Sequence, residues 1–201
     1  MHIEKIELQN FRNYKNLELE FSKNVNLILG KNAQGKTNLL EAVYLTAIGR
    51  SFRTSKDLDL VKFNENNAIV KVWAEKELNS TTVEISIKRK GEKSSEKFIK
   101  KDRKNVTKTS QLLKNILIVI FSPEDLKIVK DEPEKRRKFI DRELSQISPK
   151  YYNSLSNYKK SLLQRNTYLK EDNLEPSIID LWDIQLAKYG AEVIFLRKEF
   201  I

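Results

Sequence analysis

Cysteine is absent from this chain of 201 residues, and its single histidine is His2. A chain without thiols has no disulfide, no thiolate zinc site and no cysteine nucleophile, and one histidine cannot build a multi-histidine metal centre. No apolar run approaches the roughly 20 residues that cross a bilayer, and residues 1–5 are not followed by the apolar segment of a secretory signal. We therefore expect a cytoplasmic protein whose chemistry does not depend on histidine.

Glycine is also scarce, and two of the five glycines lie in one short segment. Residues 30–37 read Gly-Lys-Asn-Ala-Gln-Gly-Lys-Thr, after the apolar run 25–29 and before an apolar helical pattern. This spacing predicts a phosphate loop, because the glycines let backbone N–H groups curl toward an anion and the following helix adds the positive end of its dipole. In such a loop Lys36 reaches the β- and γ-phosphates of a nucleotide, and the Thr37 hydroxyl binds the Mg²⁺ that bridges them.

The first half of the chain alternates apolar and polar residues in the way of half-buried strands. Residues 2–8 and 17–21 predict an antiparallel pair that turns around residues 10–14. Residues 68–76 and 81–88 predict a hairpin, to which Phe98 and Ile99 add a short third strand. The helix that starts at Lys36 is expected to end near Gly49.

Two other runs, residues 25–29 and 116–121, are apolar at almost every position. That pattern is typical of strands that are covered on both faces of a sheet, and the phosphate loop would leave the carboxyl end of the first one. The patterns together predict an α/β (α+β) fold. After the second run, Ser122 and Pro123 indicate a capped helix start, so Glu124 and Asp125 are not interpreted as Walker B acids.

Positive charge is concentrated in one stretch. The net charge is +10, and a net +7 lies between Lys88 and Lys108, where ten basic residues stand against three acidic ones. A polyanionic partner such as nucleic acid is one interpretation, and a solvated hairpin face whose lysines block edge pairing is the other. Arg50 and Arg53 are likewise either cations at the negative end of a helix or contacts for phosphate or DNA.

Proline marks a change of composition, because all four prolines follow residue 122 and each precedes a helical pattern. We therefore expect two lobes, residues 1–122 and residues 123–201. Apolar spacings of three and four over residues 151–169 and 179–200 predict an antiparallel helical hairpin with a heptad-like seam, although ordinary amphipathic helices in a bundle fit as well. The second pattern reaches residue 201 without a stop signal, so we expect a truncated sequence.

Six segments together resemble one known family. They are Asn-Phe-Arg-Asn-Tyr at 10–14, the phosphate loop with Asn-Leu-Leu-Glu-Ala at 38–42, Gly-Arg-Ser-Phe-Arg-Thr at 49–54, Phe-Ser-Pro-Glu-Asp-Leu at 121–126, Arg-Arg-Lys-Phe-Ile-Asp at 136–141 and Gln-Arg-Asn at 164–166. In this order and spacing they resemble the RecF family of bacterial recombination mediators, which is similar to the heads of SMC-type ATPases of the ABC class. The resemblance implies an ABC/SMC-like P-loop ATPase lobe, incomplete here, beside an all-helical lobe.

The resemblance also implies roles for particular residues. The expected nucleotide-binding residues, for ATP with Mg²⁺, are Gly30, Lys31, Asn32, Ala33, Gln34, Gly35, Lys36, Thr37, Asn38 and Arg12, with Thr37 as the metal ligand. The candidates for sensing the γ-phosphate where the lobes join are Ser122, Glu124 and Asp125. The candidates for DNA binding come from the charge pattern and not from the resemblance; they are Arg50, Arg53, Lys97, Lys100, Lys101, Arg103 and Lys104.

The implied function is DNA gap repair, with links to replication and the SOS response. ATP would drive dimerisation on DNA, and the protein would bind single-stranded DNA and junctions of single- and double-stranded DNA and load RecA there together with RecO and RecR. No Ser-Gly-Gly signature loop and no Walker B strand occur in the 201 residues, so we expect negligible ATP hydrolysis and weak ATP binding by this chain.

Two hypotheses from other classes stay open. One is a P-loop kinase of a small anionic substrate, in which the basic stretch is a lid. The other is a nucleotide-independent scaffold for DNA or protein, in which the phosphate loop is vestigial. The salt dependence of DNA binding separates the first alternative from the repair protein, because contacts with phosphates make affinity fall steeply as salt rises.

Overall fold

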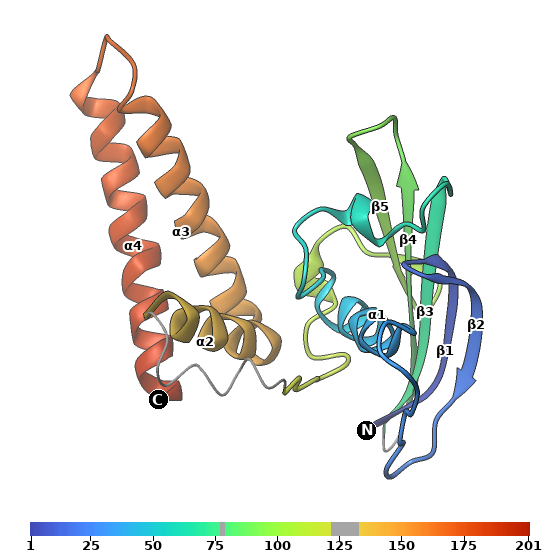
Figure 1. Cartoon of the computed structure of the whole chain (residues 1–201). Coiled ribbons are helices and arrows are strands. Elements are labelled where there is room, and N and C mark those ends of the chain that lie inside the picture. The colour runs from blue at the N-terminus through green and yellow to red at the C-terminus, as the bar shows by residue number, and fades with distance from the viewer. Residues whose placement is uncertain (77–78, 122–132) are drawn as a thin grey trace. The chain divides into compact units, whose positions relative to one another are not determined.

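The computed structural model describes residues 1–76, 79–121 and 133–201 (Figure 1). The chain forms two compact units, Met1–Ile118 and Val119–Ile201, each of which is described by itself below. The sequence placed a lobe boundary near Ser122, a residue outside the described ranges.

The first unit is built on a six-stranded antiparallel sheet in the order β2-β1-β3-β4-β5-β6. The strands are β1 His2–Phe11, β2 Tyr14–Glu20, β3 Asn67–Glu75, β4 Ser80–Arg89, β5 Ser95–Lys101 and β6 Lys104–Asn105. The predicted β1–β2 pair, the β3–β4 hairpin and the short strand around Phe98 are therefore confirmed. These strands were predictable from the alternation of apolar and polar residues, because each strand buries one face and successive side chains point to opposite faces.

One helix, α1 Lys36–Ile48, packs against one face of this sheet (Figure 1). Alternate strand residues such as Val72 and Ile85 are fully buried in the core. The opposite face carries charged side chains, for example Glu7 paired in register with Lys71. α1 ends as predicted at Gly49, whose φ of 78° and N–H bond to the carbonyl oxygen of Leu45 (2.7 Å) stop the helix.

The two uniformly apolar runs are not strands, and this part of the prediction is wrong. Residues 25–29 and 116–121 have irregular backbone, and Val25, Leu29, Val119 and Phe121 are exposed. An apolar residue at every position fits a strand only if other strands flank it and both faces are covered. Within residues 1–76, 79–121 and 133–201 no strand pairs with either run.

The described residues of the second unit include three helices, α2 Pro133–Ile147, α3 Pro149–Tyr168 and α4 Pro176–Phe200. Each begins with a proline, as predicted, because proline has no N–H to lose at the first helical position; Pro123 lies outside the described residues. α3 and α4 form the predicted antiparallel hairpin (Figure 1). The antiparallel direction is shown by three polar pairs, Ser154–Glu192, Ser161–Gln185 and Arg165–Asp183. Along α3 the residue numbers rise, while the numbers of their partners on α4 fall.

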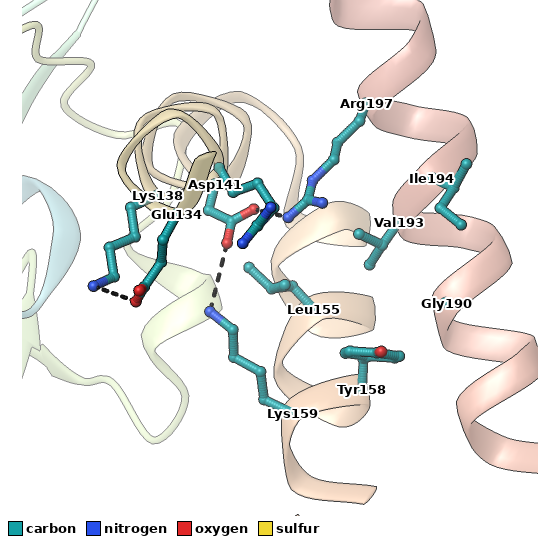
Figure 2. Close-up of a pocket in the computed structure, with 11 residues that line it drawn as sticks. Glu134, Lys138, Asp141, Leu155, Tyr158, Lys159, Gly190, Val193, Ile194 and Arg197 are labelled. Atoms are coloured by element: carbon teal, nitrogen blue, oxygen red, sulfur yellow. Dashed lines mark hydrogen bonds and ion pairs between the residues drawn. The ribbon is translucent and has the colours of Figure 1, made fainter. Parts of the chain in front are cut away.

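A carboxylate joins the three helices where they meet (Figure 2). Asp141 on α2 accepts hydrogen bonds from the Tyr151 hydroxyl on α3 and from Arg197 Nη2 on α4 (2.6 Å), and Lys159 Nζ lies 3.5 Å from it. Burial raises the pKa of Asp141, but the bonds from Tyr151 and Arg197 outweigh burial, so the pKa lies below its ordinary value. Burial, followed by Asp141, raises the pKa of Tyr151 to about 12.

In the part of the chain that the structure describes, no helix is both long and apolar enough to cross a membrane.

We predict that Asp141→Asn destabilises the helical unit by about 2 kcal/mol at pH 7, less than for a fully buried pair because Arg197 is partly exposed. The folded pKa is lowered, so this contribution is present at neutral pH and lost as the pH falls through the folded pKa, and the two proteins should converge in acid. Urea unfolding followed by Trp182 fluorescence in a Trp73→Phe background measures the helical unit. Lys159→Gln removes only an exposed lysine from its 3.5 Å ion pair with Asp141, so it should change stability by less than about 0.5 kcal/mol. Equal losses in both variants would contradict the prediction.

Candidate functional site

Residues 30–37 curl in the way that the sequence predicts. Ala33 and Gly35 adopt positive φ angles of 65° and 103°, and α1 begins at the next residue. The Lys36 ammonium lies across the loop and donates to the carbonyl oxygens of Gly30 (2.7 Å) and Lys31 (2.8 Å). Among the described residues no carboxylate forms an ion pair with Lys36. The charge of Lys36 therefore stays at the loop and can turn to an anion.

The turn between β1 and β2 packs against this loop. Asn13 Nδ2 donates to the carbonyl oxygen of Gln34 (3.1 Å), and the Tyr14 hydroxyl donates to that of Gly35 (3.1 Å). Asn38, in the first turn of α1, donates to Asn13 Oδ1 (2.8 Å). A Cβ on Gly35 would lie 2.6 Å from Asn13 Nδ2 and 3.0 Å from the Tyr14 hydroxyl. Only glycine therefore lets the turn approach the loop this closely.

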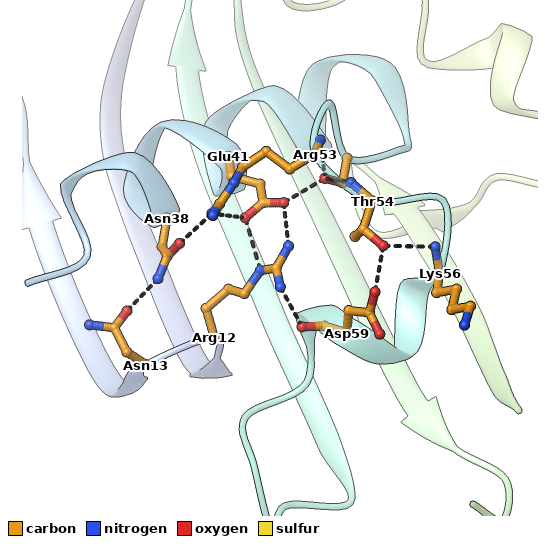
Figure 3. Close-up of polar contacts among 9 residues, drawn as sticks. Arg12, Asn13, Asn38, Glu41, Arg53, Thr54, Lys56 and Asp59 are labelled. Carbon is orange, nitrogen blue, oxygen red and sulfur yellow. Dashed lines mark hydrogen bonds and ion pairs between the residues drawn. The ribbon is translucent and has the colours of Figure 1, made fainter. Parts of the chain in front are cut away.

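A buried carboxylate lies one turn further along α1 (Figure 3). Glu41 is 0% exposed and receives Arg12 Nε at 2.9 Å and Arg12 Nη2 at 2.7 Å. The Ser51 hydroxyl and Arg53 Nη1 (3.3 Å) also donate to it. Burial alone raises the pKa of Glu41, but the hydrogen bonds from Arg12 and Ser51 and the two positive charges outweigh it, so the pKa is lowered and Glu41 is ionised at neutral pH.

The two arginines have further partners in the same group of side chains. Arg12 Nη1 donates to the carbonyl oxygen of Asp59 (2.9 Å), and Arg53 Nη1 donates to Asn38 Oδ1 (2.7 Å). Arg12 was expected near the nucleotide; it lies in the turn between β1 and β2, and its guanidinium group binds Glu41 on the helix that follows the loop. Arg53 was proposed as a DNA contact, and here it binds a residue of the expected nucleotide set; Arg50 is exposed.

The other basic candidates differ in how they are held. Lys97 Nζ donates to the carbonyl oxygen of Gly49 (2.8 Å) and pairs with Asp57 (2.9 Å), so it ties β5 to the end of α1. Lys100 lies on the opposite sheet face, 3.7 Å from Glu84. Arg103 and Lys104 are exposed at the turn between β5 and β6, and Lys101 is half-buried beside them. Ser122, Glu124 and Asp125 lie outside the described residues.

Sequence reasoning missed Glu41, Asn13 and Tyr14 as parts of this site. A signal for Glu41 was available, because it is a lone carboxylate in the apolar sequence Leu-Leu-Glu-Ala-Val and thus on a helix face with no solvent. Asn13 and Tyr14 belong to the segment at 10–14 that carried the family resemblance, but nothing in their spacing placed them on the loop.

The helical unit holds a separate hollow of about 430 Å³. Figure 2 shows Leu155, Tyr158 and Val193 on its apolar side, and Lys159 and Arg197 reach Asp141 on its polar side. It contains none of the residues predicted for nucleotide or DNA. Over the described ranges no group of three or more acidic, His or Cys side chains could hold a metal ion by itself.

Comparison with known proteins identifies the family. The model of the AAA domain matches residues 5–193, nearly the whole chain. The chain belongs to the AAA domain family.

The relatives of this AAA domain include the DNA replication and repair protein RecF of Clostridium tetani (strain Massachusetts / E88), which is 46% identical over 100% of this chain and 54% of that protein. RecF of Clostridioides difficile (strain 630) is 44% identical over 100% of this chain and 53% of its own length. The resemblance to RecF is confirmed. The chain spans about half the length of the curated relatives it matches.

Two solved structures share the fold of this AAA domain. The recombination mediator protein RecF with ATPrS, in the RecFOR pathway, matches with a TM-score of 0.92 and 40% identity over 99% of this chain and 54% of that chain. RecF with ATP matches with a TM-score of 0.90 and 39% identity over 99% of this chain and 53% of that chain. The predicted mixed α/β fold class is confirmed.

We predict that Gly35→Ala destabilises the first unit of the AAA domain by about 2 to 3 kcal/mol, because strain at a positive φ is joined by a clash with Asn13. Urea unfolding followed by Trp73 fluorescence, in a Trp182→Phe background, measures it.

The matched control is Gly91→Ala, where φ is also positive (82°) but no atom lies within 4 Å of the added Cβ. It should lose only about 1 kcal/mol. Adding Asn13→Gly to Gly35→Ala should recover part of the loss. Equal losses at the two glycines would show that the packing of the turn on the loop contributes nothing.

Proposed function

We propose that this chain is the ATP-binding part of a RecF-type DNA-repair protein. The observation that carries the proposal is the curled loop with the Lys36 ammonium held across it by two backbone carbonyl oxygens, 2.7 and 2.8 Å away. A triphosphate would take the ammonium from these carbonyls and accept bonds from the loop N–H groups and the start of α1. The similar solved structures are of RecF with ATP and with ATPrS, which supports the same ligand.

The residues present fit Mg²⁺ through one ligand. Thr37 is exposed at the first turn of α1, where its hydroxyl can join the phosphate oxygens around the ion. Glu41 is not available to the ion, because its oxygens are engaged by Arg12, Ser51 and Arg53. Mg²⁺ would bind here together with the nucleotide, and bound Mg²⁺ would neutralise phosphate charge.

The function proposed for the whole protein is gap repair in the cytoplasm. It binds single-stranded DNA and junctions of single- and double-stranded DNA, forms an ATP-dependent homodimer there, and promotes RecA loading with RecO and RecR during recombination and the SOS response. The names of the relatives, DNA replication and repair protein RecF, support this proposal. The exposed cations around the β5–β6 turn provide a surface for DNA phosphates.

We predict that Lys36→Ala weakens ATP binding at least about tenfold, because a charge-assisted bond to phosphate is lost from the loop. Isothermal titration of this chain with ATP and Mg²⁺ measures it. Lys160→Ala is the matched control: Lys160 is an exposed lysine of α3 outside the expected nucleotide-binding set, and its replacement changes the net charge by the same amount, so ATP affinity should stay unchanged.

Equal affinity of the Lys36→Ala variant and the unmodified chain would favour the scaffold with a vestigial loop. We also expect ATP turnover to stay at background. Turnover that Lys36→Ala abolishes would contradict that expectation.

For DNA, we predict that replacing Lys100, Lys101, Arg103 and Lys104 together by glutamine weakens binding and lowers the slope of log affinity against log salt by about 3, since each of the four lost phosphate contacts contributes about 0.7 to 0.9. Fluorescence anisotropy with a gapped oligonucleotide at several salt concentrations measures both. The control replaces four exposed lysines of the helical unit, Lys150, Lys160, Lys170 and Lys198.

Two outcomes would redirect the DNA proposal. Unchanged DNA binding in the first quadruple variant would remove the basic stretch from it. A flat salt dependence in the unmodified chain would favour the P-loop kinase.

A further inference from the structure

Glu41 is an ionised side chain in the protein core, where the loss of hydration makes a charge energetically unfavourable. It is 0% exposed on a helix whose neighbouring residues Ala42 and Leu45 are core residues. A buried carboxylate persists only when donors replace its water. Here four donor groups do so, and they come from two segments outside α1. One is the β1–β2 turn, which contains Arg12, and the other is the segment after Gly49, which contains Ser51 and Arg53.

The arrangement fixes two guanidinium groups beside the phosphate loop. Arg12 binds Glu41 through two nitrogens, a geometry that sets its orientation. Arg53 is held between Glu41 and Asn38. Their side chains remain 20% and 43% exposed, so both cations can still meet a ligand from solution. Without Glu41, the two like charges would repel, and each arginine would keep one weaker partner, the Asp59 carbonyl oxygen for Arg12 and Asn38 for Arg53.

We propose that Glu41 is a positioning residue of the phosphate site, which holds Arg12 and Arg53 in place for the phosphates of a bound nucleotide. Two arginines and Lys36 with one carboxylate leave a net positive site, and a polyphosphate is the ligand chemistry that fits it. This inference rests on the function proposed above.

The effect of Glu41→Gln on ATP affinity tests the proposal, because a role of Glu41 through its charge alone and a role in positioning the arginines predict opposite changes. A carboxylate near a phosphate repels it, so Glu41→Gln would strengthen ATP binding if charge alone mattered. Positioning predicts that Glu41→Gln weakens ATP binding about tenfold, because a neutral amide with an NH₂ group cannot hold both guanidinium groups. Isothermal titration with ATP, ADP and AMP measures the effect, and the loss should shrink as phosphates are removed.

The double variant Glu41→Gln with Arg12→Ala shows whether Glu41 acts through the arginine. If it does, adding Glu41→Gln to Arg12→Ala weakens ATP binding less than twofold further. Asp57→Asn is the matched control, because it removes a carboxylate from an ion pair with Lys97 in the neighbouring segment, and its ATP affinity should stay within twofold. The proposal would be overturned if the loss of ATP affinity in the double variant equalled the product of the losses in the two single variants. Tighter ATP binding by Glu41→Gln would overturn it as well.

A measurement without nucleotide separates this inference from the proposed function. In the unmodified chain, the Arg12 Nε–H that donates to Glu41 should give a slowly exchanging NMR signal, which Glu41→Gln should abolish while the amide spectrum of the sheet is kept. Persistence of the signal would overturn the positioning role. Loss of the signal in a chain that binds no ATP would overturn the proposed function and leave the positioning role supported.

A second variant serves if Glu41→Gln does not fold. Glu41→Asp keeps the charge but is one methylene shorter, so it cannot reach Arg12 and Arg53 together. It should lose ATP affinity by about the same factor, and an affinity equal to that of the unmodified chain would overturn the proposal.

Discussion

The close packing of the β1–β2 turn on the phosphate loop is the constraint on which the site depends. No strand leads directly into the loop, because residues 21–29 have irregular backbone, so sheet hydrogen bonds do not fix its shape. Asn13 and Tyr14 do so instead, by holding two consecutive carbonyl oxygens of the loop. That contact requires a residue without a side chain at Gly35. The shape of the loop, and of the anion site proposed there, therefore depends on residues more than twenty positions earlier in the chain.

Each unit is also organised by one ionised carboxylate that joins separate segments. Glu41 connects α1 with the β1–β2 turn and the segment after Gly49, and Asp141 connects α2 with α3 and α4. In both cases an arginine supplies the main counter-charge, and the pKa of the carboxylate is lowered despite its burial. Such pairs add little to net stability but penalise every arrangement in which the partners are apart, so they favour one packing of the segments.

Local pattern predicted much of the fold, and its failures have a common cause. Alternation of apolar and polar residues predicted the strands around Val72 and Ile85, Gly49 predicted the end of α1, and the prolines predicted the helix starts. These features are predictable because each depends on a residue and its nearest neighbours in the chain. The runs at 25–29 and 116–121 were read as buried strands from the same kind of pattern. Burial of a strand, however, depends on neighbours, and the sequence of the run itself cannot supply them.

The site shows the same limit for charges. Sequence grouped Arg53, Lys97 and Arg103 together as cations for DNA, because charge is all that composition reveals. In the structure their partners separate them: Arg53 is held by Glu41 and Asn38, Lys97 by Asp57 and Gly49, and Arg103 is exposed on a turn. A cation that already has a protein counter-charge releases few ions when a polyanion arrives, so it contributes little to salt-dependent binding. For the proposed DNA binding, the exposed cations of the β5–β6 turn are thus the best suited of the candidates, while Arg53 lies in the group of side chains around Glu41.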